Sequence, residues 1–195
     1  MGFLVFVAHD DIDPSKVWEE EILRQLQSCH VFLLLLSRRF HSSKWTDQET
    51  GIAIARGKLV VPLRVDVNPY GFAARYQAFG LGRNKLRTSC LNLFGVLKQE
   101  QRTRSRAISS LINAFAGSKD FSDAGDKAEL LQECRQMTRR QISGVLEASI
   151  ANAQICKSIE ATRNLATIIR RHRKDINQAQ LKRYNLVSIH PIPLK

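Results

Sequence analysis

Three short runs of apolar residues near the start of the chain constrain its fold more than any other feature. The runs are Phe3 to Ala8, Val31 to Leu36 and Leu59 to Val65, and none of them alternates apolar with polar residues. Unbroken runs of this length are typical of strands that are buried on both faces of a parallel sheet. Because helical stretches separate the runs, the sequence predicts the order β-α-β-α-β with right-handed crossovers.

The segments between the runs carry signals for helix starts and ends. Asp13 and Pro14 supply a cap and a first-turn proline for a helix that we expect to end near Ser28. Thr46, with two serines before it, offers caps for a second helix, which Gly57 stops. Ligands of parallel sheets collect at the carboxyl ends of the strands, so the loops 9–15, 37–45 and 66–72 are the places to look for a site.

Composition and motifs exclude several classes of protein. A hydrophobic content of 44% is too high for a disordered chain, and the longest apolar run has six residues where a bilayer span needs about 20. The four cysteines show no zinc spacing, and no secretion signal is visible, so we expect reduced thiols, no metal and a cytoplasmic location. Gly80 and Gly82 lack the third glycine of a dinucleotide fingerprint, and no nucleophile elbow is present.

The net charge of +12 lies entirely in the second part of the chain. Residues 1–82 hold nine basic and nine acidic residues, and residues 83–195 hold the remaining 21 basic and nine acidic ones. This asymmetry is found both on surfaces that bind polyanions and on solvated helix faces. We favour solvated faces, and nucleic-acid binding stays an alternative.

Helical periodicity replaces the strand pattern after residue 82. We predict helices over 83–117 that flank the first domain, a linker over 118–125 and a small helical bundle within 118–185. The basic run from Arg170 to Lys174 follows at a helix C-terminus, and we expect a loose tail over 186–195. No internal repeat is visible.

Three ordered segments within the range 1–82 resemble the Toll/interleukin-receptor (TIR) domain in its bacterial form. The segments are VFVAHDDIDPSKVWEEEI, FLLLLSRRFHSSKWTDQETGIAIARG and LVVPLRVDVNPYGF. The resemblance implies an α/β fold with a flavodoxin-like parallel sheet, here followed by an all-α helical extension. It also implies one more strand and helix before Met1, with that strand between the first two apolar runs, so we expect a gap in the sheet and an N-terminally truncated domain.

Many bacterial TIR domains cleave NAD+ at the nicotinamide–ribosyl bond, in defence or signalling. The resemblance maps their essential glutamate onto Glu49 and implies that Trp45, Ser37 and Phe40 line the substrate crevice. NAD+ would be a substrate and not a cofactor. Pattern alone also allows simpler roles, because Thr46 to Glu49 fits the S/T-x-x-E capping box and Trp45 fits a core position.

The resemblance implies a further role for the loop after the first apolar run. Asp10, Asp11 and Pro14 correspond to the loop through which TIR domains associate, although a solvated turn and a helix cap explain the same residues. We therefore expect other TIR domains as partners and a homo-oligomer. The alternative to an NAD+-cleaving enzyme is a non-catalytic TIR scaffold.

Overall fold

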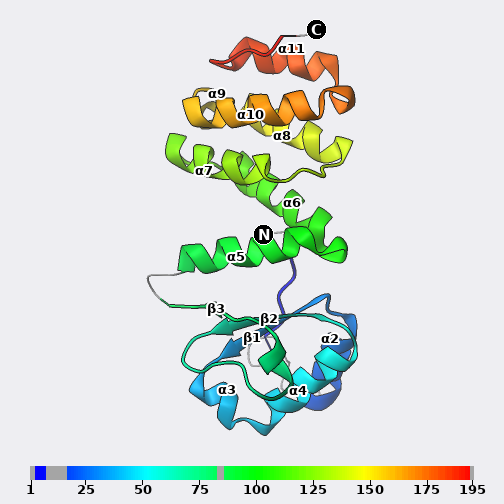
Figure 1. Ribbon diagram of the computed structural model, residues 1–195. Coiled ribbons are helices and arrows are strands. Elements are labelled where there is room, and N and C mark those ends of the chain that lie inside the picture. Colours follow the sequence, from blue (N-terminus) through cyan, green and yellow to red (C-terminus); the bar gives the residue numbers. More distant parts are fainter. Residues whose placement is uncertain (1–2, 8–16, 83–85, 194–195) are drawn as a thin grey trace. The chain divides into compact units, whose positions relative to one another are not determined.

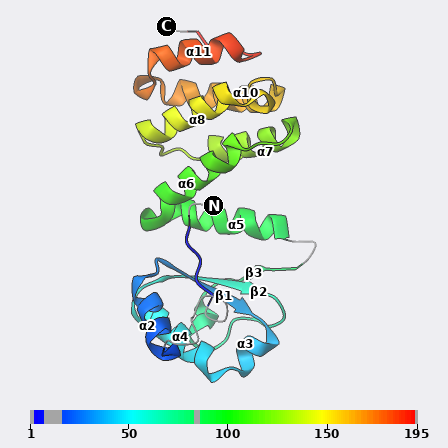
Figure 2. The ribbon, with the colours of Figure 1, turned by 180° about the vertical axis from the view of Figure 1, so that it is seen from behind.

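The computed structural model describes residues 3–7, 17–82 and 86–193. The chain divides into two compact units, with Leu4–Arg102 in one and Thr103–Lys195 in the other. The division falls at the start of a helix, so it coincides with neither of the boundaries predicted after residues 82 and 117. We call the units the α/β unit and the helical unit (Figures 1 and 2).

The α/β unit is built on a parallel sheet, as the apolar runs predict. In the described residues the sheet has three strands in the order β1-β2-β3, namely β1 (Val31–Leu36), β2 (Leu59–Arg64) and the two-residue strand β3 (Phe79–Gly80). Residues pair in register from Val31 with Leu59 to Leu36 with Arg64. The other elements are α2 (Trp18–Ser28), α3 (Arg38–Ser42), α4 (Lys44–Ala55), the 3₁₀ turn η1 (Gly71–Arg75) and α5 (Leu86–Gln99).

The prediction of a strand over Phe3 to Ala8 is wrong for the residues that the structure describes. Residues 4–7 form no strand, and Leu4 and Val5 are 100% and 72% exposed. Within the described part of the chain β1 pairs with β2 alone, and Leu33 and Leu35 of β1 stay 39% and 52% exposed. An apolar run becomes a strand only where a neighbouring strand accepts its hydrogen bonds, and residues 4–7 belong to none of the strands of the described sheet.

One face of the sheet packs against two helices, and this contact forms the core of the α/β unit. Ile22 and Leu26 of α2 meet Leu34 and Leu36 of β1, and Ala53 of α4 lies in the same cluster. The two leucines of β1 are fully buried. The alternation of side chains along β1 therefore separates a buried face from the face that carries Leu33 and Leu35.

Gly57 ends α4, as the sequence predicts. Its φ of +62° lies in the left-handed region that favours glycine. The amides of Arg56, Gly57 and Lys58 donate to carbonyls of the last helical turns, at 3.0 Å each. This hydrogen-bonded end turns the chain directly into β2.

The helical unit is a stack of antiparallel helical hairpins and not an irregular bundle (Figures 1 and 2). Its elements are α6 (Gln101–Ala116), α7 (Phe121–Gln132), α8 (Arg139–Ala151), α9 (Ala153–Cys156), α10 (Ile159–Arg171), η3 (Arg173–Asp175) and α11 (Gln178–Val187). Helix α7 packs along α10, and α8 packs along α11.

The two hairpins α7–α8 and α10–α11 are structural repeats, which the sequence pattern did not predict. Helix α10 corresponds to α7, and α11 corresponds to α8. The two corresponding pairs are separated by almost the same number of residues along the chain. Each helix has a side-chain cap at its N-terminus: Asp120, Thr138, Ser158 and Asn177. The matched spacing of caps is the sequence signal that could have revealed the repeat.

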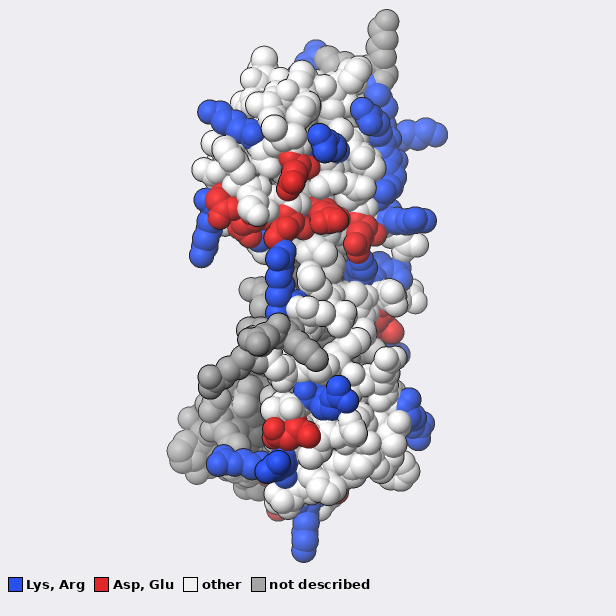
Figure 3. Space-filling model, turned by 60° about the vertical axis from the view of Figure 1, so that its left-hand side comes forward, with Lys and Arg blue, Asp and Glu red and all other residues white. Residues whose placement is uncertain are grey.

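Charged side chains are unevenly spread over the helical unit. In Figure 3 acidic side chains gather in a band across this unit, while basic side chains form a column along one side. Asp123 lies in the first turn of α7, and Glu160 lies in the first turn of α10. Arg170 and Arg171 lie in the last turn of α10. This placement suits the helix dipole at those positions.

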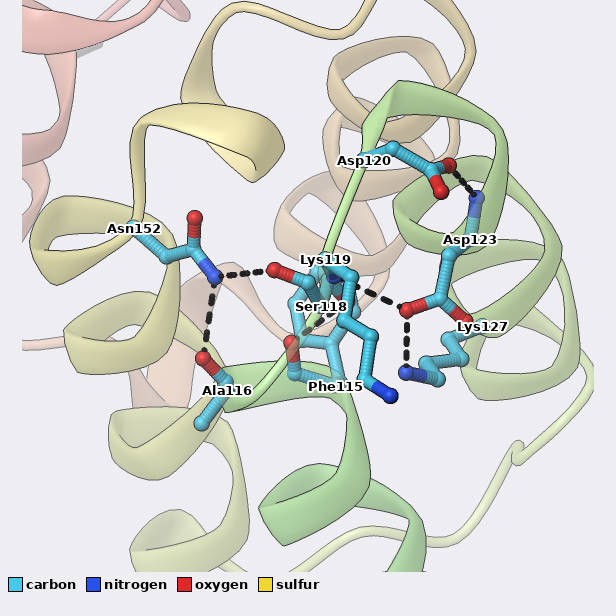
Figure 4. Close-up of polar contacts among 8 residues, drawn as sticks. All are labelled: Phe115, Ala116, Ser118, Lys119, Asp120, Asp123, Lys127 and Asn152. Atoms are coloured by element: carbon cyan, nitrogen blue, oxygen red, sulfur yellow. Dashed lines mark hydrogen bonds and ion pairs between the residues drawn. The ribbon is translucent and has the colours of Figure 1, made fainter.

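The linker predicted over 118–125 is instead a tight, hydrogen-bonded turn into α7 (Figure 4). Asn152 Nδ2 donates to the carbonyls of Ala116 at 3.0 Å and of Ser118 at 2.9 Å. Asp120 accepts the amide of Asp123 at 2.8 Å and so caps α7. The small, polar composition of this segment reflects capping chemistry and not flexibility, and the chain has no domain boundary there.

The described part of the tail is packed, in contrast to the loose tail that the sequence predicts. Asn185 and Ile192 exchange two hydrogen bonds of 2.7 and 2.8 Å, and the Ile192 side chain is 3% exposed. Thr162 Oγ1 lies 2.7 Å from His190 Nδ1. The tail therefore folds back over α11 and α10 and closes that end of the helical core.

The four cysteines are free thiols, as expected. Cys134 and Cys156 are buried, Cys29 is half-buried and Cys90 is exposed. Burial is the largest cause of the raised pKa of Cys29. In the described residues no helix is long and apolar enough to cross a membrane, and no group of side chains has the composition of a metal site.

Candidate functional site

Helix α4 separates two hollows of the α/β unit, each of about 300 Å³. Trp45, Gln48, Glu49 and Ile52 line one of them, which we call the α2–α4 hollow. Asp47 and Thr50 line the other, which we call the loop hollow. The helical period puts these two sets of side chains on different sides of α4.

The α2–α4 hollow combines an apolar floor with carboxylates. Ile22, Leu23 and Leu26 of α2 contribute apolar surface, and Glu19 stands in the first turn of the same helix. Trp45 and Glu49 lie one helical turn apart on the opposite wall. Trp45 is 47% exposed, so the interpretation of this residue as simple core is wrong.

Glu49 is the chemically unusual group of this hollow. Its side chain is half-buried, and its carboxylate makes no hydrogen bond or ion pair in the part of the chain that the structure describes. Burial raises its pKa above the ordinary value of 4.5. A half-buried carboxylate without a partner is poorly placed for stability and well placed to meet a cationic or hydrogen-bonding ligand.

The capping box that the sequence allows for Thr46 and Glu49 is not formed. Helix α4 begins at Lys44, so Thr46 stands inside the first turn and not at the N-cap. Its Oγ1 donates toward the carbonyls of Phe40 at 2.7 Å and of Ser43 at 2.8 Å. The hydroxyl thus ties α4 to the end of α3, and capping does not explain Glu49.

The loop hollow lies beside the segments that follow β1 and β2. Phe40, Tyr70 and Phe72 give it aromatic walls. Tyr70 Oη donates to Asp47 Oδ1 at 2.7 Å. Burial and this carboxylate raise the pKa of Tyr70 to about 12. The Tyr70 ring meets His41 edge-on, with 4.4 Å between ring centroids.

Tyr70 and Asp47 were not among the sequence-predicted site residues. Both fall in or beside predicted loop regions, but no local pattern indicates that two residues so far apart in the chain meet. The loop hollow is lined by residues of two of the loops that we expect to hold a site, 37–45 and 66–72. The available signal was their place in or beside the loops that follow two neighbouring parallel strands.

Ser37 has a local structural role at the end of β1. Its Oγ accepts the Phe40 amide at 3.1 Å and caps α3. The Arg38 amide next to it donates to Asp66 Oδ2 at 3.2 Å, which joins the loops after β1 and β2. Ser37 lines neither of the two hollows.

The structure therefore brings together only part of the predicted site. Trp45 and Glu49 share one hollow, Phe40 lies in the other, and Ser37 borders the start of α3. The predicted assembly residues Asp10, Asp11 and Pro14 lie outside the described residues.

Comparison with known families decides what this unit is. The model of the TIR domain family matches residues 1–89. These residues form a TIR domain. The match covers the sheet, α2, α3 and α4, and so includes both hollows. The flavodoxin-like α/β class predicted from the sequence is confirmed for the TIR domain, and the all-α extension is confirmed for the residues that follow it.

The TIR domain match ends at residue 89, before the helical unit begins. Neither the curated proteins nor the solved structures that were compared contain a match to this chain. TIR domains include enzymes that cleave NAD+, and TIR domains commonly associate with other TIR domains. Family membership alone does not choose between these two roles.

Proposed function

We propose that this TIR domain cleaves NAD+ at the nicotinamide–ribosyl bond and that Glu49 is its catalytic carboxylate. The observation that carries the proposal is the half-buried Glu49 carboxylate, which has no partner within the described residues and shares a hollow with Trp45. An unpaired carboxylate with an apolar surround interacts strongly with a developing positive charge.

The chemistry of NAD+ fits such a group. When the bond between the ribose C1′ and the pyridinium nitrogen breaks, both electrons go to nicotinamide, which leaves as a neutral molecule without protonation. The ribosyl group then carries positive charge, which an ionised Glu49 stabilises. A water oxygen bonds to C1′ and loses a proton, so the products are nicotinamide, ADP-ribose and one proton.

The other residues of the α2–α4 hollow suit the nicotinamide ribosyl half of the substrate. The exposed indole of Trp45 offers a flat surface for an aromatic ring. A volume of about 300 Å³ is at the lower limit of small-molecule pockets, so this hollow accommodates part of a dinucleotide. We assign Ser37 and Phe40 to contacts with the other half of NAD+. This half of the substrate would extend across the start of α4.

Nicotinamide release from NAD+ by the full chain tests the proposal. We expect release by the unchanged chain and its loss in Glu49→Gln, a change that removes the charge and keeps the size. Glu20→Gln, on the exposed side of α2, is the matched control and should keep the activity. Turnover by Glu49→Gln at the unchanged rate, or no release by the unchanged chain, would contradict the proposal.

A second candidate function is a non-catalytic scaffold that acts through association of TIR domains. It is favoured by the separation of Phe40 from Glu49, because the predicted substrate residues do not converge on one hollow. In this case sedimentation should show association that Asp11→Ala or Pro14→Ala weakens, with no nicotinamide release. A monomer at all concentrations would exclude the scaffold. In either function we expect a role in bacterial defence or signalling.

A further inference from the structure

The turns that close the two helical hairpins lie at the same edge of the helical unit. The α7–α8 turn covers residues 133–138, and the α10–α11 turn covers residues 172–177. Arg139 Nε donates to Asp175 Oδ1 at 3.0 Å, which joins the start of α8 to the second turn. Arg171 Nη1 donates to the Gln132 carbonyl at 2.7 Å, which joins the ends of α10 and α7.

This edge concentrates positive charge. Arg104 of α6 reaches it through a 2.5 Å hydrogen bond from Nη1 to Gln136 Oε1. We call the following eight residues the basic edge: Arg104, Arg135, Arg139, Arg140, Arg170, Arg171, Arg173 and Lys174. The acidic residues in the same segments are Glu133 and Asp175. Eight cations thus stand against Glu133 and Asp175 in these segments, and the last turn of α7 adds Glu129.

Helix dipoles do not explain the whole cluster. Arg170 and Arg171 are favoured at the C-terminus of α10. Arg139 and Arg140 occupy the first turn of α8, where the positive end of the helix dipole disfavours cations. The ion pair with Asp175 offsets this cost for Arg139, whereas Arg140 makes no such pair in the described part of the chain, so its position favours a bound anion.

The basic edge has both fixed and free cations. Arg104, Arg139, Arg171 and Arg173 are held by hydrogen bonds to neighbouring segments. A second set is exposed and makes no side-chain hydrogen bond or ion pair in the described part of the chain: Arg135, Arg140, Arg170 and Lys174. The fixed cations shape the edge, and the free set is available to a partner.

We propose that the basic edge binds nucleic acid through its backbone phosphates. Seven of its eight cations are arginines, whose planar guanidinium groups match phosphate oxygens in pairs. The turn segments 133–138 and 172–177 contain no Phe, Tyr or Trp, so stacking of bases on aromatic rings does not contribute, and contacts to phosphates carry no sequence information. The interaction is electrostatic and weakens steeply with salt.

The surroundings of the basic edge favour nucleic acid over a lipid surface. Surfaces that bind membranes combine cations with exposed apolar side chains. The exposed large apolar residues of the helical unit, among those described, lie in other segments: Phe121, Ile159, Leu186, Val187 and Ile189. Phe121 and Ile159 begin α7 and α10, at the ends of these helices away from the basic edge.

Fluorescence anisotropy with a short labelled duplex DNA of mixed sequence tests the proposal on the full chain. We expect binding at low salt. The logarithm of the association constant should fall linearly with the logarithm of the salt concentration. To remove the free set we use the variant Arg135→Gln/Arg140→Gln/Arg170→Gln/Lys174→Gln. The slope of the logarithm of affinity against the logarithm of salt concentration should become shallower by up to about four. The affinity itself should fall by at least about tenfold.

A matched control removes the same charge from other parts of the helical unit. The variant Lys119→Gln/Lys157→Gln/Arg163→Gln/Lys182→Gln changes four exposed cations outside the basic edge. It should keep most of the affinity and nearly the full slope. Equal loss in the two variants would show a net-charge effect and overturn the proposal, as would no binding by the unchanged chain.

Two further measurements test whether the ligand is a lipid surface and whether the variants stay folded. Vesicles with and without phosphatidylserine, assayed by flotation, test the lipid alternative, and binding to vesicles but not to duplex would overturn the proposal. Circular dichroism of both variants should match the unchanged chain, because the substituted side chains are exposed. The result is independent of NAD+ cleavage, since Glu49 is unchanged in both variants.

Discussion

Tyr70 Oη donates a hydrogen bond to Asp47 Oδ1 at 2.7 Å and so joins the loop after β2 to α4. The bond lies in the loop hollow, next to the edge-on contact of Tyr70 with His41. It fixes the side of α4 that faces away from Glu49. Tyr70 therefore holds in place the helix on which the proposed catalytic residue stands.

The first prediction concerns the titration of Tyr70. Its pKa of about 12 lies above the ordinary 10, so the stability from this bond is complete below pH 10 and is lost as the pH rises toward 12. Absorbance at 295 nm should show a tyrosine that ionises near pH 12, and Asp47→Asn should lower that pKa. An unchanged titration in Asp47→Asn would contradict the assigned hydrogen bond.

The second prediction concerns the stability of Glu49→Gln. Because burial raises the pKa of Glu49, the contribution of this residue to stability is present at low pH and lost as the pH rises through the raised pKa. Near pH 7 the charge therefore opposes folding, and the variant should melt at the same or a higher temperature. The difference should vanish at about pH 4, where the carboxyl is protonated.

A lower melting temperature of Glu49→Gln near pH 7 would instead show that the carboxylate has a structural partner. The pH dependence of catalysis offers an independent check. Nicotinamide release should rise with pH through a pKa above 4.5, since the proposed mechanism needs the ionised form.

The third prediction concerns Asn152, which holds the α6–α7 turn (Figure 4). Asn152→Ala removes two hydrogen bonds to the carbonyls of Ala116 and Ser118, and the cap of α9 through Gln154. We expect a loss of about 2 kcal/mol in the free energy of unfolding. Asn113→Ala, at an exposed position of α6, is the control and should change stability by less than about 0.5 kcal/mol.

The fourth prediction concerns the tail. Ile192 is 3% exposed, so Ile192→Ala should lower the free energy of unfolding by about 2 kcal/mol. Ile189 is 45% exposed and binds Cys156 through its backbone amide, so Ile189→Ala should have little effect. Denaturant unfolding of the two variants compares them directly. Equal stability of both would show that the tail does not pack in solution.

The sequence predicts some parts of the site better than others. The shared hollow of Trp45 and Glu49 follows from the helical period, because both residues lie on α4 and their relation is local. The separation of Phe40 from Glu49 depends on how α4 rolls against α2 and η1, which no local pattern encodes. The capping box failed for a related reason: α4 begins earlier than its best capping signal, and Thr46 bonds to the end of α3 instead.

The sequence by itself determined the bounds of β1 and β2 nearly to the residue, the helix stop at Gly57 and the TIR class of the range 1–82, which lies within the matched residues 1–89. The strand bounds and the helix stop rest on side-chain patterns within a few neighbouring positions, and the TIR class rests on the resemblance of three ordered segments to that family. Tertiary structure alone decided that Tyr70 meets Asp47, that the hairpin turns gather cations at one edge and that the tail is packed. Those contacts join residues far apart in the chain, so they depend on the packing of whole elements and leave little trace in local periodicity.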